Sequence, residues 1–148
     1  MKTWATACLA SALLLGCSSH SEQWESSNVA EIANVGIALS SDLWINHMPV
    51  IGDQATTVLH GALHLNSNLA LPEGLNAQAV IIQQGDQRWE IDAKQIDVRA
   101  YSENQWDVIF AAPINIDERA DAEVSLQLSI DGETQWFHEK HVGIDAVY

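Results

Sequence analysis

The stretch AVIIQQGDQRWEI, residues 79–91, sets the interpretation of the whole chain, because its apolar pattern and its turn chemistry agree. A two-residue loop at Gly85-Asp86 places glycine first, as a type II′ hairpin turn requires. This loop fixes three facing pairs: Gln84–Gln87, Ile82–Trp89 and Val80–Ile91. The last two pairs are apolar and fall on one face of the ribbon, so we predict an antiparallel hairpin with that face inward.

Alternation of apolar and polar residues with a period of two continues through most of the chain, which is typical of half-buried strands. It is clear in residues 35–39, 57–65, 106–110 and 124–128. Within residues 57–65, one face carries Thr57, Leu59, Gly61, Leu63 and Leu65. We expect this more apolar face to point inward, and His60 and His64 to lie on the outward face.

Residues 123–142 predict a second hairpin, for which two turns compete. A two-residue loop at Asp131-Gly132 gives the pairs Leu126–Phe137 and Leu128–Gln135. A three-residue loop that begins at Ile130, with a left-handed glycine, gives Leu126–Trp136 and Leu128–Thr134 instead. We prefer the three-residue loop because it buries Trp136 with the leucines. It leaves Phe137 outside.

Short strands separated by turns, in a chain of this size, predict an all-β fold: a single antiparallel β-sandwich of about seven or eight strands. The pattern resembles an immunoglobulin-like or fibronectin-III-like domain, and we expect it to span residues 29–148. The sequence lacks the cysteine pair and the tyrosine corner of true immunoglobulin domains, since its only tyrosines are Tyr101 and Tyr148. We identify no named family for this domain.

The first residues, MKTWATACLASALLLGCSSH, have the pattern of an export signal, with Lys2 followed by an uncharged run over residues 5–15. This run is too short to span a bilayer, which takes about 20 apolar residues. It ends in LLGC, residues 14–17, which resembles the lipobox of bacterial lipoproteins. The alternative is an ordinary secretory signal with an incidental cysteine.

The lipobox resemblance implies a covalent lipid on Cys17, a diacylglycerol on sulfur with an N-acyl chain, after removal of residues 1–16. Ser18 resembles the pattern of lipoproteins sent to the outer membrane. We therefore expect a lipid anchor at the periplasmic face of the outer membrane and a flexible tether over residues 17–28. Cys8 would be removed with the signal, so the mature chain would have no disulfide and would depend on its core.

The chain is strongly acidic, with 20 Asp and Glu residues against 6 Lys and Arg residues and a net charge of −14. Loss of the signal peptide removes one basic residue, Lys2, and no acid, so the mature chain is more negative still. Such a surface repels nucleic acid, and we exclude DNA and RNA as partners.

The two histidines of VLHGALHL, residues 58–65, raise the question of a metal site. On a strand, His60 and His64 lie roughly 13 Å apart, too far to bind one ion. A site would need further ligands, and His47 and Met48 in WINHMP are the candidates if their strand lies beside residues 57–65. A periplasmic protein that binds copper or zinc through these four residues is therefore the alternative function.

The sequence shows no glycine-rich phosphate loop, nucleophile elbow or HExxH motif. We therefore expect no enzyme and no cofactor besides the lipid on Cys17. The leading hypothesis is a binding or structural module of the cell envelope that contacts a protein partner through sheet edges or loops. The aromatic left exposed in the second hairpin, Trp136 or Phe137, is a candidate contact. The oligomeric state stays open.

Overall fold

The computed structural model describes residues 27–48, 52 and 57–148, and the predicted signal peptide and Cys17 lie outside this part of the chain. Its ten strands, in chain order, are β1 (Val29–Ile32), β2 (Val35–Asn46), β3 (Leu59–Ser67), β4 (Asn76–Gln84), β5 (Gln87–Asp92), β6 (Ile96–Ser102), β7 (Gln105–Ala112), β8 (Ala122–Ile130), β9 (Glu133–Val142) and β10 (Ile144–Val147). A short 3₁₀ helix, η1 (Ala93–Gln95), joins β5 to β6. No helix among the described residues has the length and apolar character needed to cross a membrane.

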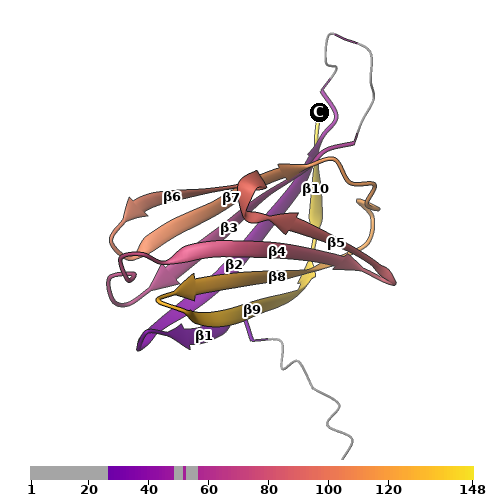
Figure 1. Cartoon of the computed structure of the whole chain (residues 1–148). Helices are drawn as coiled ribbons and strands as arrows, with labels where there is room; N and C mark the ends of the chain where they lie inside the picture. Colours follow the sequence, from indigo (N-terminus) through magenta and orange to yellow (C-terminus); the bar gives the residue numbers. More distant parts are fainter. Residues whose placement is uncertain (1–26, 49–51, 53–56) are drawn as a thin grey trace, which may run out of the picture.

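The strands form two sheets that face each other (Figure 1). The first has the order β1-β2-β3-β7-β6, with β10 also paired to β2, and the second has the order β5-β4-β8-β9. All pairings are antiparallel except that of β10 with β2. The prediction of an all-β fold with two antiparallel sheets is confirmed apart from the parallel pairing of β10, and the described residues form ten strands rather than the expected seven or eight.

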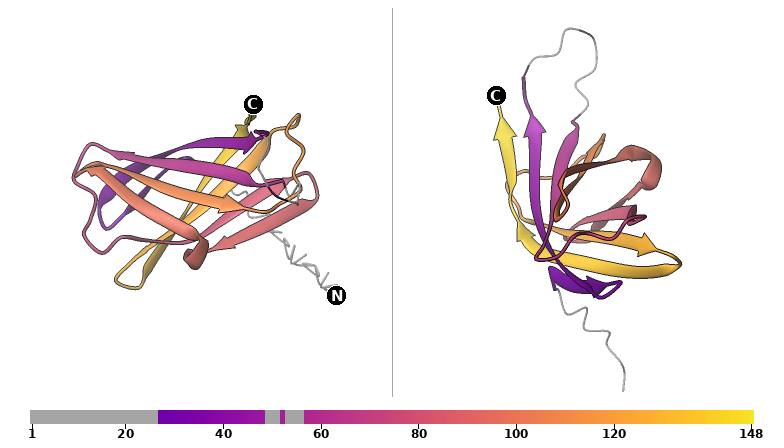
Figure 2. Two further views of the ribbon diagram at one scale, coloured as in Figure 1. Left: turned by 90° about the horizontal axis from the view of Figure 1, so that it is seen from above. Right: turned by 90° about the vertical axis from the view of Figure 1, so that its left-hand side faces the viewer.

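The first and last described strands, β1 and β10, lie at the same edge of the first sheet. β1 pairs with β2 at residues 35–38, and β10 pairs with the same strand at residues 43–46. Figure 2 shows β10, in yellow, leaving the end of β9 and running alongside β2. This side of the molecule is therefore covered by the chain's own terminal strands.

The inner faces of both sheets share one hydrophobic core, which follows from the period-two alternation. The inward prediction for Leu59, Leu63 and Leu65 is confirmed, since each is at most 1% exposed. For Thr57 it is wrong, because this residue is exposed and precedes the start of β3. Gly61 shares this inner face and lies opposite Phe110 of β7. A Cβ atom on Gly61 would lie 2.2 Å from Cζ of Phe110, so the phenyl ring fills the space that a side chain would need.

The first hairpin has the predicted register. Its pairs are Gln84–Gln87, Ile82–Trp89 and Val80–Ile91. Gly85 has a φ of +58° while Asp86 has no positive φ, as a type II′ turn requires.

The second hairpin does not have the register that we preferred. β8 and β9 are joined by the two-residue loop, with φ of +48° at Asp131 and +82° at Gly132, which is the pattern of a type I′ turn. Leu126 therefore faces Phe137, and Leu128 faces Gln135. The three-residue loop is wrong because Phe137, with no exposed surface, fills the core in place of Trp136.

Candidate functional site

His64 lies between two aspartates on the outer face of the first sheet. Its Nδ1 is 2.8 Å from Oδ1 of Asp107, and its Nε2 is 2.9 Å from Oδ2 of Asp42. The central strand β3 places the ring between β2, which carries Asp42, and β7, which carries Asp107. Asp107 is only 6% exposed, so one of the two carboxylates is nearly withdrawn from water.

The aspartates favour the protonated form of this histidine. Burial alone would lower the pKa of His64, but its hydrogen bonds to Asp107 and Asp42 outweigh that effect, so the pKa is raised above the ordinary value of 6.5. The protonated ring donates from both nitrogens, and an imidazolium has no free lone pair for a metal ion. In the protonated form of His64 the cluster is an ion-paired bridge across three strands.

His60, the second histidine of the opening pair, has a different environment. It lies opposite Trp44 of β2, and the two rings stack with centroids 5.6 Å apart and planes 11° apart. The predicted strand and outward face are confirmed for both histidines, although neighbouring side chains leave them only half exposed.

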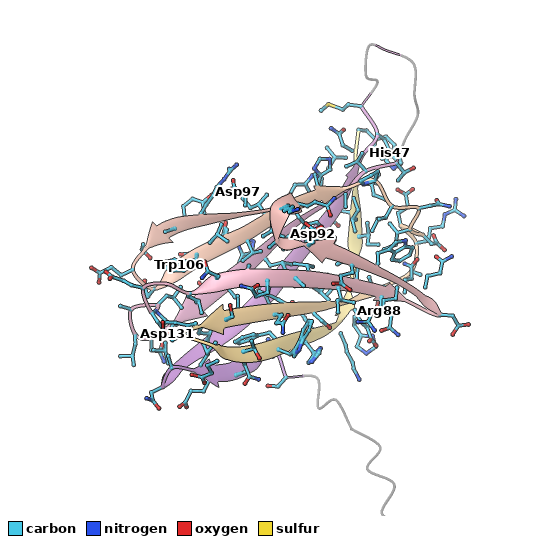
Figure 3. All side chains as sticks on the ribbon, in the orientation of Figure 1. His47, Arg88, Asp92, Asp97, Trp106 and Asp131 are labelled. Carbon is cyan, nitrogen blue, oxygen red and sulfur yellow. The ribbon has the colours of Figure 1, made fainter. Side chains whose placement is uncertain are left out.

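The end of β2 carries the other two predicted metal ligands. Nε2 of His47 is 2.6 Å from Oε2 of Glu118, and its ring stacks on Tyr148 with centroids 5.2 Å apart (Figure 3 labels His47). Met48 is 51% exposed. His47, His60 and His64 thus each have separate partners. Over the described residues, no three His, Cys, Asp or Glu side chains are arranged to hold a metal ion.

The outer face of the second sheet carries Trp136 and His138 of β9, whose rings stack with centroids 6.2 Å apart. Oγ of Ser125 lies 2.7 Å from Nδ1 of His138, across the β8–β9 pair. Burial lowers the pKa of His138, against a raising effect of Glu123 and with a further lowering by Lys140, so the ring is neutral at pH 7. A hydroxyl beside a neutral imidazole is the chemistry of a nucleophile and its base. Here the pair links β8 and β9 across the outer face of the second sheet.

Sequence reasoning missed the Ser125–His138 pair because its register was wrong by one residue. The same error affects the predicted partner contacts. Phe137 is buried, so its assignment as a contact is wrong, and the aromatic that reaches the surface of this hairpin is the half-buried Trp136.

On the side of the molecule opposite β1 and β10, the first sheet ends in a strand whose outer edge has no described partner. β6 is the last strand of the first sheet, and no described strand pairs with its outer edge (Figure 1). Val98 of β6 faces inward, since it lies opposite the fully buried Val108, yet it remains 41% exposed. An edge strand with an uncovered core-facing side chain is a surface on which another strand can add.

The outer face of β6 carries one charge of each sign. Nε of Arg99 donates to Oδ2 of Asp97 at 3.0 Å, and both side chains are more than half exposed (Figure 3 labels Asp97). Tyr101 follows at a β-bulge and is 64% exposed. The sequence analysis did not predict this strand, although the alternation of Ile96, Val98 and Ala100 in IDVRAYS would have indicated it. No signal in these residues indicates that the strand lies at an edge.

Comparisons of the chain with models of protein families, with curated proteins and with solved structures found no match. The functional inference therefore rests on the sequence and on the geometry above.

Proposed function

We propose that this protein is a lipid-anchored, non-catalytic binding module of the bacterial cell envelope. The observation that carries the binding role is the open edge of β6. Its outer backbone groups have no partner strand among the described residues, and Val98 on its core-facing side stays 41% exposed. Unpaired N–H and C=O groups recruit an added strand, and uncovered apolar side chains increase the gain from its docking.

The strand order supports an immunoglobulin-like identity for the fold. The order β2-β3-β7-β6 in one sheet and β5-β4-β8-β9 in the other corresponds to strands A-B-E-D and C′-C-F-G of that fold. In this correspondence β10 extends strand G and runs parallel to strand A.

The proposed localisation of the protein rests on the lipobox-like LLGC at residues 14–17. A lipid on Cys17 would hold the domain at the periplasmic face of the outer membrane, because each buried methylene contributes about 0.8 kcal/mol to membrane binding. The edge of β6 would then be presented to other components of the envelope.

The binding role is tested by a photo-reactive amino acid placed at Tyr101 in the full chain, in the bacterium that makes it. Illumination is expected to produce a covalent adduct from this position, because Tyr101 is exposed beside the open edge. The matched control carries the same probe at Arg88 of β5, an exposed position away from β6 (Figure 3 labels Arg88). No adduct from Tyr101, or equal adducts from both positions, would count against binding at β6.

A further inference from the structure

We propose that the strand that docks on β6 is β6 of a second copy, so that two chains form a two-fold dimer through this edge. This inference rests on the proposed binding role of β6 and names its partner. It is carried by the self-complementary order of side chains in IDVRAYS, residues 96–102.

An antiparallel pairing about a two-fold axis at Val98 places Val98 opposite Val98 of the second copy. Asp97 then lies opposite Arg99 of the second copy, and Ile96 lies opposite Ala100. Residues directly opposite in an antiparallel pair share one face of the sheet. On the outer face, the Asp97–Arg99 ion pair of each chain therefore lies beside that of the other chain with opposite charges adjacent, and the inner face gains only apolar pairs.

The charges also favour this register over the registers in which the two-fold axis is shifted by one residue. A shift of the axis by one residue sets Arg99 against Arg99, or Asp97 against Asp97, and like charges directly opposite destabilise a sheet. Charged side chains on an edge strand ordinarily prevent such pairing. Here their opposite signs, placed symmetrically about Val98, permit it despite the net charge of −14 on each chain.

Apolar burial distinguishes β6 from β5, one of the two end strands of the second sheet. That strand also has opposite charges two residues apart, at Arg88 and Glu90. Of its two core-facing side chains, Ile91 is 1% exposed and Trp89 is partly buried against the core, so neither is as exposed as Val98. The 41% exposure of Val98 makes β6 the edge that gains from a second copy.

The size of the interface predicts where the dimer forms. One strand pair of seven residues buries less area than the roughly 1,200 Å² of a stable interface, so association is weak in dilute solution. Chains held on one membrane by the proposed lipid have a far higher effective concentration, which favours the pairing.

The first test is disulfide formation by Val98→Cys in membranes that carry the full chain. Paired residues lie about 4.5–5.5 Å apart between Cα atoms, within the range for a disulfide. The control, Ser102→Cys, lies on the same edge, but the axis sets it roughly 26 Å from its copy. On mild oxidation we expect a disulfide-linked dimer band from Val98→Cys and no such band from Ser102→Cys.

The second test changes the charges in the Val98→Cys background. Asp97→Arg alone and Arg99→Asp alone each create like-charge pairs, so each is expected to lose the dimer band. The two single variants mixed in one membrane are expected to recover it, as is the double variant, because opposite charges face each other again. Thermal unfolding of every variant checks that these exposed substitutions leave the fold intact.

The outcomes separate this inference from the proposed function. A monomeric Val98→Cys, or equal dimer bands from Val98→Cys and Ser102→Cys, overturns the second copy as the partner. If the Tyr101 probe captures a different protein while Val98→Cys stays monomeric, the binding role of β6 stands and the dimer is wrong. If the probe captures nothing and no dimer forms, both are wrong.

Discussion

At the scale of the residue, His64 shows what a one-dimensional pattern misses. Its outward position follows from alternation in the sequence. Its hydrogen bonds do not, because Asp42 and Asp107 are 22 and 43 residues away and meet it only through the order β2-β3-β7. The predicted separation of His60 and His64 depends on local geometry alone, whereas the partners of each ring depend on which strands are neighbours.

The raised pKa of His64 predicts a pH-dependent contribution to stability. Protonation favours the folded state, so the contribution is fully present below pH 6.5 and is lost as the pH rises through the raised pKa. We expect His64→Gln to lower the free energy of unfolding by about 1–3 kcal/mol at pH 6, and by less at pH 8.5. Urea unfolding at both pH values measures this.

A second variant tests the effect of one aspartate on the pKa of His64. Asp42→Asn keeps the imidazole ring and removes one carboxylate, so the pKa of His64, followed by NMR titration, is expected to fall. A stability loss in His64→Gln that is as large at pH 8.5 as at pH 6 would contradict the ion-paired account.

At the scale of the element, the two hairpins show when turn chemistry is sufficient. At Gly85-Asp86 the turn and the apolar pairs favour the same register, and the structure has that register. At Asp131-Gly132 two turns are chemically acceptable, and the choice depends on which aromatic fills the core. Which aromatic fills the core depends on the side chains of the opposing sheet, and the sequence of the hairpin alone does not specify them.

The observed register predicts unequal roles for two adjacent aromatics. Phe137→Ala removes a fully buried ring and is expected to cost about 3–5 kcal/mol of unfolding free energy. Trp136→Ala removes a half-buried ring on the outer face, and its cost is expected to be clearly smaller. Urea unfolding of both variants measures the difference, and the opposite ranking would support the three-residue loop.

The contact between Gly61 and Phe110 predicts a coupling between β3 and β7. Gly61→Ala forces a methyl group into the phenyl ring, and we expect a loss of about 1–3 kcal/mol. In a Phe110→Leu background the same substitution is expected to cost less, since the ring is gone. A double-mutant cycle by urea unfolding measures this coupling, and additive losses would show that the ring does not occupy the space beside Gly61.

At the scale of the whole molecule, the fold class was predictable, but the order of the strands was not. Alternation and turns predict two sheets with one core. That β6 is left at an edge depends on the long-range pairings of β3 with β7 and β4 with β8. The candidate binding surface was therefore not predictable from the sequence, and its strand, residues 96–102, was missed although its alternation is that of a strand.

The proposed anchor makes a prediction for the whole chain. Cys17→Ser removes the thiol that would carry the lipid, and the domain itself is expected to fold unchanged. On fractionation we expect the natural chain with the membranes and the variant in the soluble fraction, because the loss of the acyl chains removes the main membrane affinity. Equal distribution of the two chains would point to an ordinary secretory signal.

The most direct test of the central claim, that β6 pairs with another strand on the membrane, is amide hydrogen exchange of residues 96–102. We would compare the anchored chain in its membranes with dilute Cys17→Ser protein, using β5, residues 87–92, as the internal reference. The account predicts slower exchange in β6 of the anchored chain and the same exchange in β5 of both, because an added strand protects the outer amides of β6. Equal exchange of β6 in the two samples would contradict it.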